Sequence, residues 1–209
     1  MSSFTLAELR ARLAALPRVD DAEAEAAAAV AAILRPGLSG AEILLIKRAE
    51  REGDPWSGHL AFPGGKREPL DASLLCTSIR ETREEVGLTL DATSFLARLE
   101  DVRARTNGYK VAQFVFAIDD PRVPLLTNVE VKDTLWVPLR RIEESQGKET
   151  ITRSVMGRSM DLPCVELGEY VLWGMTLRMV MQVIAAGTDT PDSAVAAGSD
   201  NRGTRGPVD

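Results

Sequence analysis

Two stripes of apolar residues at helical spacing lie near the two ends of the chain. They are formed by Leu6, Leu9, Leu13 and Leu16 and by Leu172, Met175, Met179, Val183 and Ala186. The first stripe is followed by Pro17 and predicts a helix over residues 5–16. The second predicts a helix over residues 172–186 with its methionines in the core.

Between these helices, apolar runs have the length of strands. Residues 28–34 and 42–47 are separated by a turn rich in proline and glycine, which predicts a strand, a loop and a strand. Residues 94–103 and 109–119 predict an antiparallel pair joined by a turn at Thr106-Asn107-Gly108. This periodicity indicates an α/β or α+β fold. The remaining segments with strand character are residues 135–137 and a hairpin over residues 150–165.

The most distinctive stretch covers residues 64–88. A Gly-Gly turn leads into an apolar-patterned helix whose last turns carry Glu81, Glu84 and Glu85. Because Glu81 precedes the other two by three and four residues, all three lie on neighbouring parts of one helical face. Like charges in this arrangement repel unless they are neutralised. A hard divalent cation such as Mg²⁺ would neutralise them, since it prefers carboxylate oxygens and also binds substrate phosphates.

Capping signals flank this helix. Asp71 is expected at the N-cap, where its side chain would accept hydrogen bonds from first-turn amides. Gly87 is expected to end the helix in the left-handed conformation. The side chains predicted to face the core are Leu74, Leu75 and Ile79.

The same stretch resembles a Nudix box. That pattern ends in Arg-Glu-apolar-x-Glu-Glu-x-Gly-apolar, and the match consists of Gly65, Arg80-Glu81, Glu84-Glu85 and Gly87-Leu88. The resemblance covers roughly residues 28–186 and implies the Nudix α/β/α sandwich around a mixed β-sheet. Residues 1–27 are then an N-terminal helical extension, and residues 187–209 a disordered tail rich in small and polar residues.

The box departs from the usual pattern at two points. Thr82 stands where an apolar residue is usual. The spacing from Gly65 to Arg80 is one residue longer than standard, so Ala72 takes the place of the mid-box acid and Asp71 is the nearest carboxylate. The longer form resembles the coenzyme A pyrophosphatase branch of the family.

An upstream signature of that branch is matched in part. The matching residues are Leu44-Leu45, Arg48, Gly58 and Phe62-Pro63-Gly64-Gly65. Ile46 and Ala49 replace the signature Thr and Ser, and Asp54 occupies the position of a second arginine. The loss of this arginine bears on recognition of the coenzyme A 3′-phosphate.

The resemblance implies metal-dependent hydrolysis of a diphosphate. The expected ligands of Mg²⁺ or Mn²⁺ are Glu81, Glu84, Glu85 and the Gly64 carbonyl. The ion would lower the pKa of bound water and clamp the diphosphate. Arg80 is expected to orient a neighbouring carboxylate. The base that takes the proton from water is either Glu81 or Glu130, the latter from the loop before Trp136.

Four further residues are candidates for contact with the substrate. Arg48 and Lys66 would neutralise its phosphates, or would equally be solvated surface charges. Trp56 and His59 belong to a polar loop before the glycine turn, where such residues often touch a ligand. Alternatively, Trp56 fills the edge of the core and His59 forms a local hydrogen bond.

The amino-acid composition restricts the classes of binding partner. The net charge of −6 over 209 residues disfavours extended nucleic-acid binding, and no apolar run has the length of a membrane span. Two cysteines and one histidine make disulfides and zinc poor candidates. We therefore expect a cytoplasmic protein that binds a small nucleoside diphosphate derivative, without nucleic-acid or membrane partners. A homodimer is possible from the family.

Three functions follow as hypotheses. The first is hydrolysis of coenzyme A or an acyl-coenzyme A. The second is hydrolysis of a nucleoside diphosphate sugar or ADP-ribose, which the Asp54 departure favours. The third is a non-catalytic nucleotide-sensing Nudix module, which is disfavoured because such modules usually lose box carboxylates.

Overall fold

The computed structural model describes residues 5–17, 26–53, 56–104, 108–155 and 157–188. Its centre is a seven-stranded mixed sheet, in which the order β3-β2-β1-β6-β5 is extended by β4 on β1 and β7 on β2. The strands are β1 (Ala28–Gly37), β2 (Gly40–Arg48), β3 (Leu60–Ala61), β4 (Gly64–Lys66), β5 (Phe95–Arg103), β6 (Lys110–Ala117) and β7 (Val131–Pro138).

Strand β1 organises the sheet. It pairs with β6 in parallel, whereas its pairings with β2 and β4 are antiparallel. The hairpin from β1 to β2 closes between Gly37 and Gly40, as the turn signal predicts. Strands β5 and β6 form the predicted antiparallel pair, although Thr106 and Asn107 of the expected turn lie outside the described residues.

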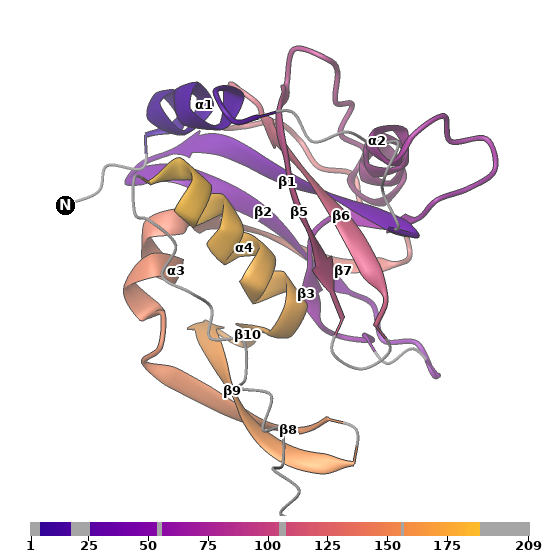
Figure 1. Cartoon of the computed structure of the whole chain (residues 1–209), viewed down its shortest axis with the longest axis vertical. Coiled ribbons are helices and arrows are strands. Elements are labelled where there is room, and N and C mark those ends of the chain that lie inside the picture. Colours follow the sequence, from indigo (N-terminus) through magenta and orange to yellow (C-terminus); the bar gives the residue numbers. More distant parts are fainter. Residues whose placement is uncertain (1–4, 18–25, 54–55, 105–107, 156, 189–209) are drawn as a thin grey trace, which may run out of the picture.

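Helices cover both faces of this sheet (Figure 1). Leu74 and Val86 of α2 pack with one set of strand side chains, and the other helices pack with the opposite set. Such two-sided coverage follows from side chains that alternate between the faces of each strand. It confirms the predicted α/β/α arrangement around a mixed sheet. The helices are α1 (Leu6–Ala14), α2 (Leu74–Val86), α3 (Leu139–Ser145) and α4 (Gly174–Gly187).

The N-terminal helix is held by its cap and by the core. Thr5 and Glu8 form a capping box, in which each side chain accepts from the backbone amide of the other residue. Leu9 and Leu13 are fully buried, and α1 packs beside α4. Helix α1 therefore lies where the leucine spacing predicts. Residues 18–25, which link it to β1, are outside the described residues.

A second, three-stranded sheet has the antiparallel order β10-β9-β8. It consists of β8 (Glu149–Val155), β9 (Arg158–Leu167) and β10 (Tyr170–Trp173) and lies at the bottom of Figure 1. The predicted hairpin over residues 150–165 is present, with Met156 at its turn outside the described residues. The short third strand was not predicted.

The last helix begins later than the apolar stripe indicates. Leu172 belongs to β10, and α4 starts at Gly174, whose φ of 66° breaks the strand. Leu172 is still buried, so the error concerns the element and not the burial. Residues 189–209, the predicted disordered tail, lie outside the described residues, and the proposed division into extension, domain and tail stays a prediction.

Candidate active site

Helix α2 carries the box carboxylates, and its two ends are capped by different residues. Ser73, not Asp71, is the N-cap, because its side chain accepts from the Cys76 amide at 3.2 Å. The prediction for Asp71 is therefore wrong. Gly87 ends the helix as predicted, with φ of 70° and its amide bonded to the Arg83 carbonyl at 3.0 Å.

Asp71 is instead the buried partner of Arg80. Its carboxylate accepts from Arg80 Nε at 3.0 Å and Nη2 at 2.9 Å, in the bidentate geometry that suits a guanidinium. It also accepts from the Glu68 amide and the Thr77 hydroxyl, each at 2.9 Å. The bond from Arg80 holds the pKa of this carboxyl far below its usual range. Asp71, the carboxylate nearest to the mid-box acidic position, therefore holds the Arg80 side chain in place.

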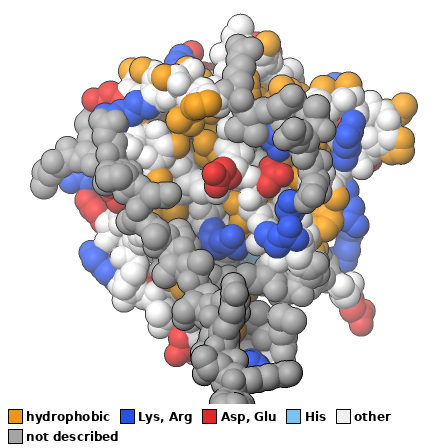
Figure 2. Space-filling model, in the orientation of Figure 1, with side chains coloured by type: hydrophobic (Ala, Val, Ile, Leu, Met, Phe, Trp, Pro, Cys, Tyr) orange, Lys and Arg blue, Asp and Glu red, His pale blue; other side chains and the backbone are white. Residues whose placement is uncertain are grey.

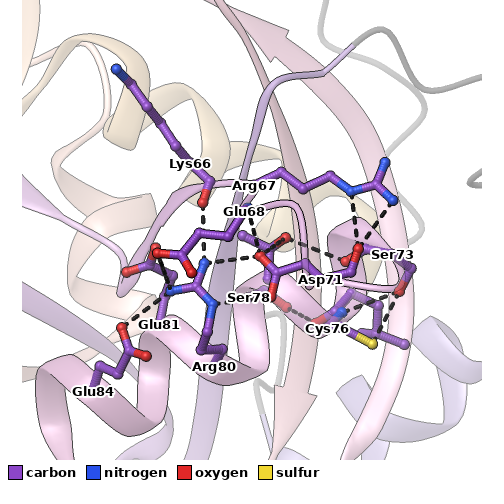
Figure 3. Close-up of polar contacts among 12 residues, drawn as sticks. Lys66, Arg67, Glu68, Asp71, Ser73, Cys76, Ser78, Arg80, Glu81 and Glu84 are labelled. Atoms are coloured by element: carbon purple, nitrogen blue, oxygen red, sulfur yellow. Dashed lines mark hydrogen bonds and ion pairs between the residues drawn. The ribbon is translucent and has the colours of Figure 1, made fainter.

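Arg80 also reaches the carboxylates of its own helix. Its Nη1 donates to Glu81 at 3.0 Å and to Glu84 at 3.1 Å, and its Nη2 donates to the Lys66 carbonyl at 3.1 Å. Figure 3 shows the guanidinium between Asp71 on one side and these two glutamates on the other. The bond to Asp71 raises the pKa of Arg80. One cation therefore orients two of the three box carboxylates.

The third carboxylate, Glu85, is the most buried, with 3% of the residue exposed. It accepts one hydrogen bond from the Gly64 amide at 2.8 Å. Its pKa is raised to about 7, chiefly by desolvation and also by the charges of Glu81 and Glu130, against the opposing effects of the Gly64 bond and the Arg48 charge. Desolvation also raises the pKa of Glu81. Glu85 thus lies in a desolvated position where neighbouring carboxylates oppose its ionisation.

The two glycines before α2 are required by space. A Cβ built at Gly65 would lie 2.4 Å from Glu81 Oε1, and one at Gly64 would lie 2.3 Å from the Ala29 carbonyl oxygen. Both are far inside van der Waals contact, because β4 lies against β1 on one side and against α2 on the other. The backbone therefore approaches the carboxylates as closely as glycine allows.

The loop before β7 completes the acidic site. The Asn128 amide donates to the Glu85 carbonyl at 3.1 Å, and the Leu126 amide donates to the Val86 carbonyl at 2.9 Å. These bonds satisfy carbonyls at the end of α2 and hold the loop beside it. Glu130 at the end of this loop is close enough for its charge to raise the pKa values of Glu81 and Glu85.

Arg51 is a site residue that sequence reasoning missed. Its Nη2 lies 3.1 Å from Glu130 Oε1, and the Ala49 amide donates to the Glu130 carbonyl at 2.8 Å. Both contacts join the loop after β2 to the loop before β7, two segments about eighty residues apart in sequence. No local motif could indicate such a pairing.

The predicted substrate residues fall in different places. The Lys66 side chain is exposed and points away from the glutamates in Figure 3, so the structure does not bring it to them. The charge of Arg48 lowers the pKa of Glu85, which places it near the acidic site. His59 packs edge-on against Trp173, with ring centroids 4.9 Å apart. Trp56 is half-buried, and its carbonyl accepts from the His59 amide at 3.2 Å.

Comparison with known proteins decides the family. The family model described as "NUDIX domain" matches residues 25–156 of this chain. The chain belongs to the Nudix family. The enzymes of this family act on pyrophosphate bonds of small nucleotide derivatives, generally with divalent metal ions. This chain is therefore a Nudix hydrolase.

Relatives of this Nudix hydrolase differ in how much of the chain they share. Human "Mitochondrial coenzyme A diphosphatase NUDT8" is 30% identical over 173 residues, 78% of this chain and 72% of NUDT8. "Uncharacterized protein C14C4.10c" of Schizosaccharomyces pombe is 38% identical over 106 residues, 46% of this chain but 32% of that protein. The chain thus spans less than half the length of this yeast relative.

Among solved structures, a MutT/nudix family protein from Enterococcus faecalis aligns with a TM-score of 0.51. The match has 18% sequence identity and covers 80% of this chain and 62% of the other. At this identity the likeness concerns the fold alone. It agrees with the mixed sheet and flanking helices seen in this Nudix hydrolase.

The carboxylates fit a hard divalent cation by their chemistry. Among the described residues, no group of three or more His, Cys, Asp or Glu side chains is already arranged to hold a metal ion. Two of the candidate ligands, Glu81 and Glu84, are instead bonded to Arg80. However, the charge of Glu130 raises the pKa values of Glu81 and Glu85, the charge of Glu81 also raises that of Glu85, and a cation would offset these effects.

The face of the molecule seen in Figure 2 carries side chains of both charges. Figure 2 shows acidic and basic side chains in small groups over the face seen in Figure 1. This distribution accompanies the net charge of −6. None of the helices in the described ranges combines the length and apolar character needed to cross a bilayer.

Proposed function

We propose that this Nudix hydrolase cleaves the diphosphate linkage of coenzyme A or an acyl-coenzyme A with Mg²⁺ or Mn²⁺. The similarity to human NUDT8, a mitochondrial coenzyme A diphosphatase, carries the choice of substrate, since it extends over most of both chains. The partial coenzyme A signature before the box, including Phe62-Pro63-Gly64-Gly65, supports it. The products would be a 3′,5′-ADP half and a phosphopantetheine half.

We propose that Glu81, Glu84, Glu85 and the Gly64 carbonyl hold the ion. A bound ion supplies a water of lowered pKa and neutralises charge on the diphosphate. Burial of Glu85 beside other carboxylates supports its assignment, because desolvation and the charges of Glu81 and Glu130 oppose its ionisation and a cation would offset them. Arg80, fixed by Asp71, would keep the carboxylates of Glu81 and Glu84 aligned.

Either Glu81 or Glu130 would take the proton from the attacking water. Glu81 belongs to a rigid helix and contacts Arg80, whereas Glu130 ends a loop and keeps 43% of its side chain exposed. Substitution of each glutamate in turn by glutamine distinguishes the two candidates. The base variant should lose kcat while its metal affinity, measured by calorimetry, stays near the wild-type value. A loss of metal affinity would identify the substituted residue as a ligand.

Arg48 is our candidate for binding substrate phosphate, because its charge already acts on Glu85. Trp56 and His59 would contact a more distant part of the substrate. For Lys66, a phosphate contact would require its exposed side chain to turn toward the site. An Arg48→Ala variant should raise KM for every diphosphate substrate, and an unchanged KM would contradict the assignment.

The decisive experiment is hydrolysis over a panel of substrates with Mg²⁺ or Mn²⁺. The panel contains coenzyme A, an acyl-coenzyme A, ADP-ribose, nucleoside diphosphate sugars and dNTPs, with Glu84→Gln and Glu85→Gln as controls. Preferred turnover of coenzyme A compounds is expected. Turnover confined to ADP-ribose or sugar diphosphates would replace the proposal by the second hypothesis. No turnover of any compound would favour a nucleotide-sensing module.

We also propose a cytoplasmic location and allow for a homodimer. Cys76 is exposed and Cys164 is buried, and both are free, as in a reducing compartment. Cell fractionation tests the location, and recovery in a membrane or organelle fraction would contradict it. Sedimentation tests the assembly, since a dimer would double the mass.

A further inference from the structure

An aromatic cluster forms where the three-stranded sheet meets the segment before the box. Trp173 at the end of β10 packs on His59, with ring planes inclined by 70°. The guanidinium of Arg153 in β8 lies 5.4 Å from the centre of a Trp173 ring. Strands β10 and β3 are neighbours in Figure 1, so three segments far apart in sequence meet here.

Arg153 is exposed and has no carboxylate partner in the described part of the chain. Apart from its contact with Trp173, its guanidinium donates one long hydrogen bond of 3.4 Å to the adjacent Thr152 carbonyl. It differs in this from Arg140, another exposed arginine, which meets Glu144 at 2.7 Å. In a protein of net charge −6, a cation resting on an indole is available to an anionic ligand.

The cluster is coupled to the acidic site through Arg48. The Arg48 amide donates to the His59 carbonyl at 3.1 Å, while the Arg48 side-chain charge acts on Glu85. The Thr176 hydroxyl donates to the Leu60 carbonyl at 3.0 Å and fixes the start of α4 beside the same segment. Arg48 therefore links the backbone next to the aromatic cluster with the charge environment of Glu85.

We propose that Trp173 and Arg153 bind the 3′-phosphorylated adenosine half of the substrate. The adenine would stack on the indole, and the guanidinium would leave the ring to bind the 3′-phosphate. The inference rests on the proposed function, because it names how this Nudix hydrolase recognises coenzyme A. His59 would support the indole from its edge.

The chemistry of each group suits this ligand. An indole offers a flat apolar face for a base, and base stacking on aromatic side chains is favourable for any purine. A guanidinium presents a planar set of donors that matches a phosphate monoester. ADP-ribose and nucleoside diphosphate sugars lack the 3′-phosphate, so this contact would select coenzyme A.

The subsite also accounts for the missing signature arginine. Asp54, which stands in its position, lies outside the described residues. Arg153 comes from a strand about a hundred residues later and would supply a cation that the signature loop lacks. The 3′-phosphate would then be recognised from the three-stranded sheet instead of from that loop.

Kinetics with coenzyme A and 3′-dephospho-coenzyme A test the assignment. Arg153→Ala should raise KM for coenzyme A about tenfold, the size expected for one charge-assisted hydrogen-bonded pair. It should leave kcat and the KM for the dephosphorylated compound near their wild-type values. Arg153→Lys should restore part of the affinity, because it keeps the charge but loses the fork of donors.

Arg158→Ala is the matched control. Arg158 is an exposed cation of the same hairpin, placed at its turn and not over Trp173, so its removal should leave both KM values unchanged. If Arg158→Ala raised KM as much as Arg153→Ala, a general charge effect would replace the subsite. Equal changes for the two substrates in Arg153→Ala would overturn the proposal as well.

A binding measurement separates this inference from the proposed reaction. By calorimetry, wild-type protein should bind adenosine 3′,5′-bisphosphate about tenfold more tightly than 5′-AMP, and Arg153→Ala should abolish the difference. If this preference held without turnover of coenzyme A, the subsite would stand and the reaction would be wrong. If coenzyme A were cleaved without any such preference, the reaction would stand and the subsite would be wrong.

Discussion

Helix α2 and the three-stranded sheet are built in opposite ways. In α2 and the residues before it, polar groups are paired closely: Arg80 alone meets Asp71, Glu81 and Glu84. These partners lie within ten residues of Arg80 in sequence. In the sheet of β8, β9 and β10, the described side chains near the turn between β8 and β9 are mostly exposed.

We propose that the chemistry belongs to the first region and the choice of substrate to the second. A network with buried partners such as Asp71 holds its geometry, which a metal site requires. Exposed arginines such as Arg153 bear little on stability and are free to change between related enzymes. Substitutions in the two regions should therefore differ in kind as well as in size.

Loss of the buried carboxylate should have the largest effect. We expect Glu85→Gln to lower kcat roughly 10²- to 10³-fold, as when a charge-stabilising group is removed from an active site. The fold should persist, since the amide oxygen can still accept from the Gly64 amide. Turnover together with circular dichroism measures both. Near-native turnover would refute the role of Glu85 as a metal ligand.

Breaking the ion pair between Asp71 and Arg80 should mainly lower the stability of the fold. Asp71→Asn removes the charge that Arg80 meets in a largely buried place, at a cost of roughly 3 to 5 kcal/mol in the free energy of unfolding. Urea unfolding measures this cost. Glu68→Gln is the matched control, because Glu68 lies 3.8 Å from Arg80 and is 60% exposed. Equal losses in both variants would show that burial of Asp71 is unimportant.

The metal-free protein should lose stability as the pH rises. The pKa of Glu85 is raised from 4.5 to about 7 in the folded state, so its stabilising effect is complete below pH 4.5 and disappears as pH passes 7. The loss should approach about 3 kcal/mol in the free energy of unfolding. Thermal melting of the wild type and of Glu85→Gln from pH 5 to 8 isolates the contribution of Glu85 to the free energy of unfolding. Parallel pH profiles for the two proteins would contradict it.

The contact between the two sheets should matter least. The Tyr170 hydroxyl donates to Asp133 at 2.8 Å, and this bond raises the pKa of the tyrosine to about 12. Tyr170→Phe should reduce the free energy of unfolding only slightly, and far less than Asp71→Asn, because one exposed hydrogen bond is lost. Urea unfolding would show it. A loss as large as that of Asp71→Asn would remove the contrast between the regions.

Local patterns in the sequence predict the box helix well. Gly87 at its end and the carboxylate face follow from capping rules and helical periodicity. Asp71 was placed wrongly because an acid just before a helix satisfies the N-cap rule as well as an ion pair does. Only the packing that brings Arg80 back over Asp71 distinguishes the two.

Contacts between distant segments could not be predicted. Arg51 meets Glu130, and Arg153 covers Trp173, without any spacing rule to connect them. Strands β3 and β4 are two and three residues long, too short to show alternation, and are defined by their partners β2 and β1. The carboxylates of the candidate site can thus be predicted from local sequence patterns, whereas the contacts around them depend on the tertiary fold.

The packing of α1 on α4 has a consequence for synthesis in the cell. Leu9 lies so close to Gly187 that a Cβ there would fall 2.1 Å from its side chain. Helix α1 therefore leaves the ribosome well before α4, the partner that completes its contacts, has been made. At 5 to 20 residues per second, its leucines wait roughly 10 to 35 seconds for this partner. The nascent chain must stay soluble through that interval with part of its apolar surface uncovered.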